Sequence, residues 1–168
     1  MKNRRGFTLI EAASVIVILM IMAVGSFVYI GFTNGIKLDA AAQKLAADIR
    51  YAQSRAMSYT VWHGVSFNVN PANTYSVYST DGSTDTAAED PAKLGSDLTV
   101  NVNSAFGATI NSVSIQEGGN KIEFSPLGAP WTDKNGMLLS SEAGVVIGLA
   151  GQTKIITITP NTGKVNVE

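Results

Sequence analysis

The chain of 168 residues is long enough for one globular domain with an appended segment. It has no cysteine, which excludes disulfides, cysteine nucleophiles and thiolate metal sites, and its single histidine, His63, excludes multi-histidine metal centres. The net charge of −1 gives no overall attraction to nucleic acid, and 45 % hydrophobic residues against 15 % charged ones indicate a concentrated apolar segment.

That apolar segment lies near the N-terminus, behind a short basic leader. Three basic residues fall within the first five positions, and Glu11 is the only charged residue between Arg5 and Lys37. Residues 12–36 are uncharged throughout, and about 20 such residues suffice for a helix to cross the hydrocarbon core of a bilayer. The basic flank predicts a single-pass segment with its N-terminus in the cytoplasm and the rest of the chain outside.

Two simpler interpretations of this segment compete with a functional one. A secretory signal peptide with a cut near residues 23–25 is one, although its apolar region is usually about 7–15 residues long and this one continues further. A plain membrane anchor is the other. Neither explains Glu11, because a carboxylate inside a spanning helix is costly and marks a candidate functional site.

Residues 5–11, Arg-Gly-Phe-Thr-Leu-Ile-Glu, followed by an apolar helix, resemble the class III signal of type IV pilins and type II secretion pseudopilins. The resemblance implies that a prepilin peptidase cleaves after Gly6 on the cytoplasmic face and then methylates Phe7. It places Glu11 at the fifth mature position, where the family carries its assembly glutamate. There Glu11 would pair with the N-terminal amine of an adjacent subunit, since an unpaired charge in an apolar filament core is strongly unfavourable. The alternative is a carboxylate that reaches the headgroups.

Helical periodicity continues beyond the apolar segment. Apolar residues recur at steps of three or four in 37–60, and the charged residues fall largely off that stripe, with Lys44 and Asp48 expected as a surface pair. No proline interrupts residues 8–59, so one helix could include both parts. Residues 45–56 are similar to the helix of the minor pseudopilin H and FimT branch. The predicted stripe consists of Leu38, Ala41, Leu45, Ile49, Ala52 and Ala56.

Period-two alternation and turn residues replace the helical pattern after residue 60 and predict an antiparallel β head. The polar stretch 81–97 is expected to be a loop. Segments 122–128 and 157–165 resemble the closing part of the pseudopilin H and FimT head. Strands are expected at 61–69, from Tyr75 onward, at 98–102, 113–115, 122–124, 145–147 and 154–159, and at a final segment ending at Val167.

The head shows little that indicates catalysis. His63 lies in an alternating strand and is expected to be a packed histidine, not a general base or ligand. Glycines at 118–119 and 148–151 are expected in hairpin turns, because no phosphate-loop lysine follows them. The acidic loop 81–97 could hold calcium. Residues 61–168 contain five lysines and ten acidic residues, a net charge of −5, so nucleic acid is not an expected partner.

The sequence therefore predicts an α+β fold: a long N-terminal helix packed on an antiparallel β head, the ladle shape of pilins. The expected parts are a leader (1–6), a transmembrane helix (7–36), an amphipathic helix (37–60) and the head (61–168). The resemblance implies a non-enzymatic minor pseudopilin of a type II secretion pseudopilus, without cofactor, in the bacterial inner membrane with a periplasmic head. Its expected partners are prepilin peptidase, other pilins or pseudopilins, and the inner-membrane assembly platform. A type IV pilus minor subunit and an anchored, lectin-like ligand-binding head stay open as alternatives.

Overall fold

A computed structural model describes residues 8–69 and 71–168 of the chain, and the side chains of residues 24–32 are outside that description. The chain divides into two compact units, which meet between Gly35 and Ile36 and are described separately below. Among the residues described, no helix combines the length and the apolar character that crossing a membrane requires.

A single helix, α1 (Leu9–Tyr59), contributes to both units. It begins at a capping sequence, Thr8-Leu9-Ile10-Glu11, in which a threonine precedes the first turn and a glutamate is the third helical residue. The helix ends where Thr60 adopts a left-handed backbone conformation with φ of 57°, a conformation that does not continue a right-handed helix. Absence of proline and this stop signal together account for its 51 residues.

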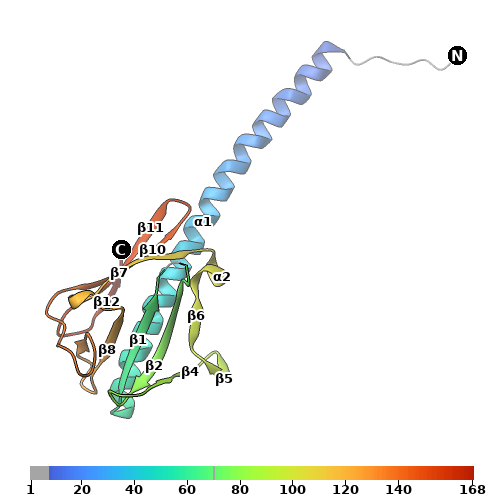
Figure 1. Cartoon of the computed structure of the whole chain (residues 1–168). Helices are drawn as coiled ribbons and strands as arrows, with labels where there is room; N and C mark the ends of the chain where they lie inside the picture. The colour runs from blue at the N-terminus through green and yellow to red at the C-terminus, as the bar shows by residue number, and fades with distance from the viewer. Residues whose placement is uncertain (1–7, 70) are drawn as a thin grey trace. The chain divides into compact units, whose positions relative to one another are not determined.

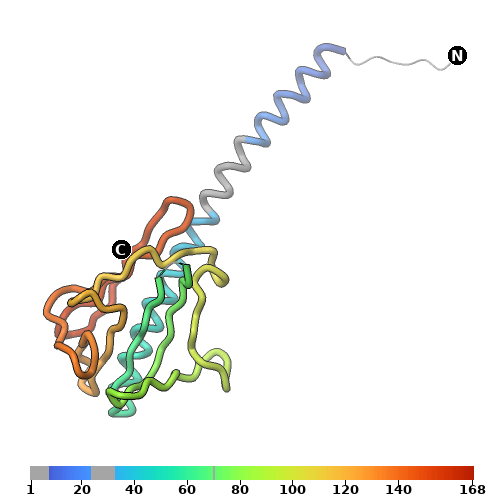
Figure 2. The backbone as a smooth tube through the Cα atoms, viewed as in Figure 1, coloured from blue at the N-terminus to red at the C-terminus, as the bar shows by residue number. Residues whose placement is uncertain are grey.

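The second unit is built around residues 36–59 of α1 and two antiparallel sheets (Figures 1 and 2). The larger sheet has the strand order β3-β2-β1-β8-β9, with β6 also paired to β2. Its strands are β1 (Trp62–Asn68), β2 (Thr74–Thr80), β3 (Asp85–Ala87), β6 (Thr99–Asn101), β8 (Lys121–Phe124) and β9 (Pro130–Trp131).

The smaller sheet has the order β12-β11-β10-β7, and a separate two-stranded hairpin joins β4 to β5. A short helix, α2, follows β6 and is capped by the Asn101 side chain, which accepts a hydrogen bond from the backbone N of Ser104. The bounds are β4 (Glu89–Asp90), β5 (Lys93–Asp97), α2 (Val102–Phe106), β7 (Thr109–Ser114), a 3₁₀ turn (Gln116–Gly118), β10 (Ala143–Leu149), β11 (Gln152–Ile158) and β12 (Val165–Val167).

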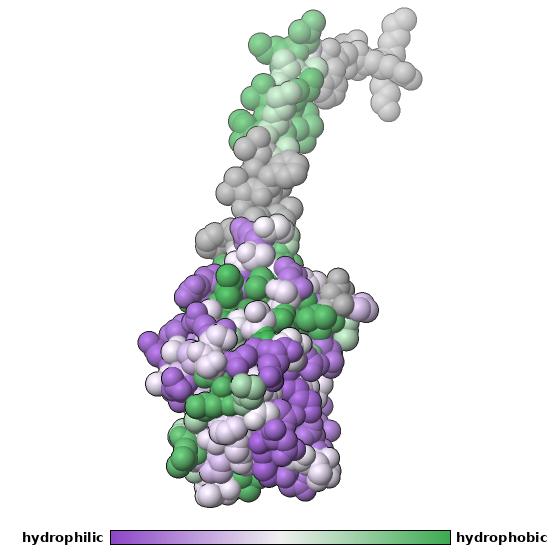
Figure 3. Space-filling view, turned by 60° about the vertical axis from the view of Figure 1, so that its left-hand side comes forward, coloured by the Kyte–Doolittle hydropathy of each residue, from purple (hydrophilic) through white to green (hydrophobic). Residues whose placement is uncertain are grey.

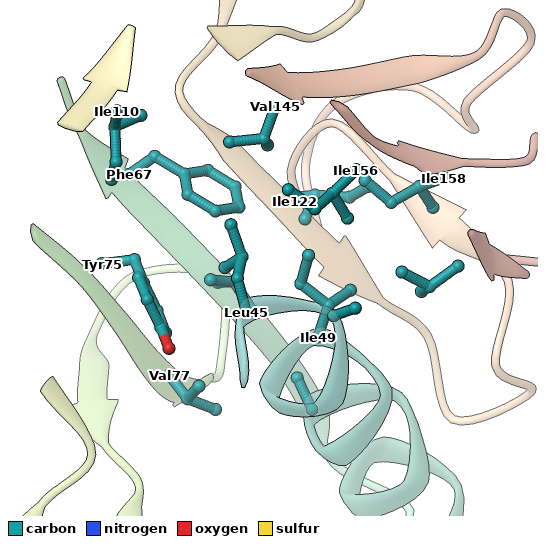
Figure 4. Packing of buried hydrophobic residues seen from close by; sticks show 14 of the residues in the cluster. Leu45, Ile49, Phe67, Tyr75, Val77, Ile110, Ile122, Val145, Ile156 and Ile158 are labelled. Carbon is teal, nitrogen blue, oxygen red and sulfur yellow. The ribbon is translucent and has the colours of Figure 1, made fainter. Parts of the chain in front are cut away.

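The core of the second unit lies where the amphipathic half of α1 meets both sheets. Figure 4 shows Leu45 and Ile49 of the helix directed at side chains of the larger sheet, such as Phe67, and of the smaller sheet, such as Ile156. All six residues of the predicted helical stripe are buried, and the three alanines among them leave room for the strands to approach closely. The predicted α+β fold, a helix packed on antiparallel sheets, is confirmed.

Local expectations for the head differ from the structure in four places. The glycines at 118–119 separate β7 and β8, which belong to different sheets, and Gly148 lies inside β10, so these residues are not in the expected hairpin turns. The predicted loop 81–97 contains β3, β4 and β5, and α2 was not expected. Strand β1 is shorter than predicted by one residue at each end. Val61 and Val69 lie outside it and are exposed. Aspartate and alanine, two of the three residues of β3, have weak strand preference, and β3 is held by pairing with β2, which no local pattern reveals.

Candidate functional site

The N-terminal turn of α1 carries the glutamate that the sequence singles out. The backbone N–H of Glu11 donates to the Thr8 carbonyl oxygen at 3.1 Å and lies 3.4 Å from the Thr8 hydroxyl oxygen. Ser14 donates its hydroxyl to the Glu11 carbonyl oxygen at 2.8 Å. The Glu11 side chain is exposed, and no partner for its carboxylate lies among the residues described. A negative charge in a first helical turn is favourable to the helix dipole.

Exposed apolar side chains cover the described part of the first unit (Figure 3, green). Their exposed fractions range from 46 % at Val15 to 89 % at Leu9. An exposed apolar surface of this kind is typical of segments that contact lipid or other apolar helices. The exposed large hydrophobic residues of this unit are Leu9, Ile10, Val15, Ile16, Val17, Ile18, Leu19, Met20, Ile21 and Met22. The predicted processing residues, Gly6 and Phe7, lie outside the described part of the chain.

In the second unit, a buried carboxylate fastens α1 to the larger sheet. Asp48 is 6 % exposed. The Tyr75 hydroxyl donates to Asp48 Oδ2 at 2.6 Å, and Lys44 Nζ donates to both carboxylate oxygens at 2.6 Å. Burial, reinforced by the Asp48 charge, raises the pKa of Tyr75 far above its usual range, so the phenol stays a donor. The expected pair of Lys44 and Asp48 does form, but the expected surface position of Asp48 is wrong, because Asp48 is buried and contacts Tyr75 of β2.

His63 completes a second junction between α1 and the larger sheet. Its Nδ1 lies 2.9 Å from the Val61 carbonyl oxygen, and Arg55 Nε donates to its Nε2 at 3.3 Å. The two contacts together require the neutral ring with the proton on Nδ1. Burial and the Arg55 charge lower the pKa of His63, against the opposing effect of the Val61 bond. Both nitrogens are used within the fold, so His63 is a packed histidine, as predicted.

Glu123 on β8 is a second internal carboxylate, and no sequence motif indicates it. Only 1 % of it is exposed. Its oxygens accept hydrogen bonds from the Tyr78 hydroxyl and from the backbone N–H of Lys134, both at 2.6 Å. Burial raises the pKa of Glu123, although these two bonds favour the ionised form. The three residues hold the 132–137 segment against the sheet.

Acidic side chains of the 81–97 segment serve its own turns and one ion pair. Asp81 Oδ1 accepts bonds from the backbone N–H groups of Ser83 and Thr84, and Asp85 pairs with Lys121 at 2.6 Å. Glu89 accepts a bond from the backbone N–H of Gly95 at 2.6 Å. Within the described ranges, no three histidine or acidic side chains are grouped to hold a metal ion, and the calcium site stays a prediction.

Family comparisons match nearly the whole chain. A family model described as "Prokaryotic N-terminal methylation motif" matches residues 1–27, and one described as "Type II transport protein GspH" matches residues 41–162. No curated protein matched the chain in a sequence search.

Solved structures share the fold at low sequence identity. The type IV minor pilin FimU of Pseudomonas aeruginosa aligns at 17 % identity and a TM-score of 0.51, covering 82 % of this chain and 92 % of that one. The minor pseudopilin EpsH from the type 2 secretion system of Vibrio cholerae aligns at 11 % identity and a TM-score of 0.58, covering 79 % of this chain and 96 % of that one. Both likenesses establish the architecture.

Proposed function

Because the chain belongs to the type II transport protein GspH family, we propose that it is a minor pseudopilin, a structural subunit of a type II secretion pseudopilus. The observation that carries this proposal is the GspH match over residues 41–162, preceded in the same chain by the N-terminal methylation motif. The head contributes packing and hydrogen bonds between helix and sheets, and the exposed apolar part of α1 provides a surface for assembly.

Processing and placement follow from the methylation motif. We propose that prepilin peptidase removes residues 1–6 and methylates Phe7. Before cleavage, the basic leader keeps the N-terminus cytoplasmic, residues 7–36 anchor the chain in the inner membrane, and the head faces the periplasm. Cleavage removes the positive side chains of the leader and leaves the Phe7 amine as the new positive charge, four positions before Glu11 in the sequence.

Glu11 would make assembly dependent on that amine. Its carboxylate is exposed on an apolar stretch of helix, with its backbone fixed by Thr8 and Ser14. In a filament the same carboxylate would be surrounded by apolar side chains, and the amine of a neighbouring subunit can neutralise it there. Loss of one partner of a buried pair costs about 3–5 kcal/mol. Glu11 therefore selects the register between subunits.

A minor pilin of a type IV pilus is the second candidate, supported by the fold shared with FimU. The charges of the head do not favour a role of such a pilin in DNA uptake. Lys121 is paired with Asp85, Lys154 lies 3.9 Å from Asp39, and the Lys134 ammonium donates to the Asp81 carbonyl. Binding to phosphates requires clustered cations that are free to displace counterions.

Crosslinking in the native host tests the proposal, and the absence of native cysteine makes it specific. Ala13→Cys places one thiol on an exposed helical position. We expect crosslinks from the processed chain to cysteine-labelled pseudopilins. Glu11→Ala should lower their yield by about tenfold or more, Glu11→Asp should give an intermediate yield, and Gly6→Ala should leave an uncut, methyl-free precursor.

Glu142→Ala is the matched control, since it removes an exposed carboxylate of the head and should leave the crosslinks unchanged. Crosslinks to pilus subunits in place of pseudopilins would favour the minor pilin. Wild-type yield from Glu11→Ala would contradict the pairing of Glu11 with the Phe7 amine.

A further inference from the structure

A depression in the second unit lies beside the turn between β2 and β3 and is not used by the assembly role described above. Its volume is about 510 Å³, within the range of about 300–1,000 Å³ typical of small-molecule sites. One aromatic residue, Trp62, one carboxylate, Asp81, and one ammonium, that of Lys134, line it. The other lining residues are Val61 and five threonine or serine residues.

The turn that forms one wall is held in place from both sides. Asp81 Oδ1 accepts three hydrogen bonds at 2.8 Å, from the backbone N–H and hydroxyl of Ser83 and from the backbone N–H of Thr84. From the opposite segment, Asn135 Nδ2 donates to the Gly82 carbonyl at 2.7 Å, and Lys134 Nζ donates to the Asp81 carbonyl. A wall fixed in this way needs little ordering when a ligand binds.

The aromatic residue is also held by a neighbour. Trp62 stands on β1 opposite Thr80, and its ring packs edge-on against Trp131 with centroids 5.5 Å apart and planes at 77°. Trp62 is half-buried, so part of it is accessible. An indole fixed at the margin of a polar depression offers an apolar surface beside hydrogen-bonding groups.

Charges in the depression are balanced. Hydrogen bonds from the backbone and side chain of Ser83 and from the backbone of Thr84 lower the pKa of Asp81 to about 2, so it is ionised at physiological pH. Its second oxygen, Oδ2, has no partner among the described residues. The Lys134 ammonium supplies the opposite charge, already directed at the Asp81 carbonyl. Neither a strongly anionic nor a strongly cationic ligand is favoured by this pair.

We propose that this depression binds an uncharged saccharide, with a sugar C–H face on Trp62 and vicinal hydroxyls donating to Asp81 Oδ2. The hydroxyls of Ser79 and Thr80 are already bonded, to the Thr86 carbonyl oxygen and to the backbone N–H of Gly82. Sugar hydroxyls both donate and accept, so they can replace the water that hydrates the other lining threonines, which an apolar ligand would not do. A nucleotide could also stack on an indole, but its phosphates would approach the Asp81 carboxylate. The site gives the head a second function that is independent of which filament contains the chain.

Titration of the full chain tests this proposal in zwitterionic micelles, because detergents with sugar headgroups would compete for the site. The probes are triacetylchitotriose, which has the N-acetylated chemistry of cell-wall glycans, and maltotriose, a plain hexose polymer. Tryptophan fluorescence and isothermal calorimetry report binding. We expect one probe to bind with a dissociation constant of about 1 mM. The probe that binds more tightly indicates whether the site recognises N-acetylated glycans or plain hexose polymers.

Three variants separate recognition from folding. Trp62→Ala should weaken binding by about tenfold or more, whereas Trp62→Tyr, which keeps an aromatic face, should stay within about threefold of wild type. Asp81→Asn keeps the Oδ1 acceptor of the turn and replaces the free oxygen by an NH₂ donor, so it should weaken binding by about fivefold. Gln152→Ala, in a separate depression, is the control and should change nothing.

Two results would overturn the proposal. One is the absence of a calorimetric or fluorescence response to either saccharide up to about 20 mM. The other is binding that survives Trp62→Ala unchanged.

Discussion

Removal of the Tyr75 hydroxyl tests whether the helix is fastened to the sheet through a buried carboxylate. Tyr75 is 1 % exposed and Asp48 6 % exposed, and the phenol donates to Asp48 Oδ2 at 2.6 Å. A hydrogen bond to a charged group is worth about 1.5–3 kcal/mol, and the carboxylate left behind stays buried. Tyr75→Phe preserves the ring and its packing, so we expect it to lower the free energy of unfolding by about 2–3 kcal/mol.

Lys44→Met is the comparison variant for the same carboxylate. The Lys44 side chain is 41 % exposed, so solvent screens its bond to Asp48, and its removal should cost less than about 1 kcal/mol. Urea unfolding of the full chain in zwitterionic micelles gives both values, because Trp62 and Trp131 report on the head by fluorescence. An equal loss in both variants, or a loss below about 0.5 kcal/mol for Tyr75→Phe, would refute the reasoning.

Two further predictions concern neighbouring junctions of the head. The pKa of His63 is lowered in the folded state, so neutral His63 stabilises the head fully above the unfolded pKa of 6.5, and this contribution declines as the pH falls below that value. Urea unfolding between pH 7.5 and 5 should show the decline. A His63→Phe variant that keeps the same pH dependence would contradict it. Gly64→Ala should lower the free energy of unfolding by about 1–3 kcal/mol, because an added Cβ would lie 2.7 Å from Glu123 Cγ and 2.9 Å from the Ile122 carbonyl oxygen. A Gly64→Ala variant as stable as wild type in the same urea assay would show that β1 and β8 can move apart there without loss of stability.

Local patterns in the sequence predicted the long helix and the strand-rich head. The stripe from Leu38 to Ala56 repeats at helical spacing, and His63, Val65 and Phe67 alternate along β1 because they are buried on one face of the strand. The turn from β10 into β11 is equally local, since Gly151 has φ of 82° there. Each of these features depends on neighbours a few positions away, and periodicity records them.

Only the tertiary structure determined which polar residues became internal. Asp48 lies on the helical flank, and the sequence could not distinguish a surface partner of Lys44 from an acceptor for Tyr75, 27 positions later. Glu123 alternates like a solvent-facing strand residue, yet the 132–137 segment covers it through the backbone N–H of Lys134. Asn73 lies in a predicted turn, and its side chain accepts a bond from the backbone N–H of Ile110 in the other sheet.

The candidate sites divide in the same way. Leader, glycine, phenylalanine and Glu11 are adjacent in the chain, so a short motif is enough to indicate processing and assembly. The depression at Trp62 is assembled from β1, the β2–β3 turn and Lys134, which lie up to 72 positions apart. A contact between such distant residues is fixed by strand pairing and by the side chains that cover the sheet, and sequence spacing carries no record of it.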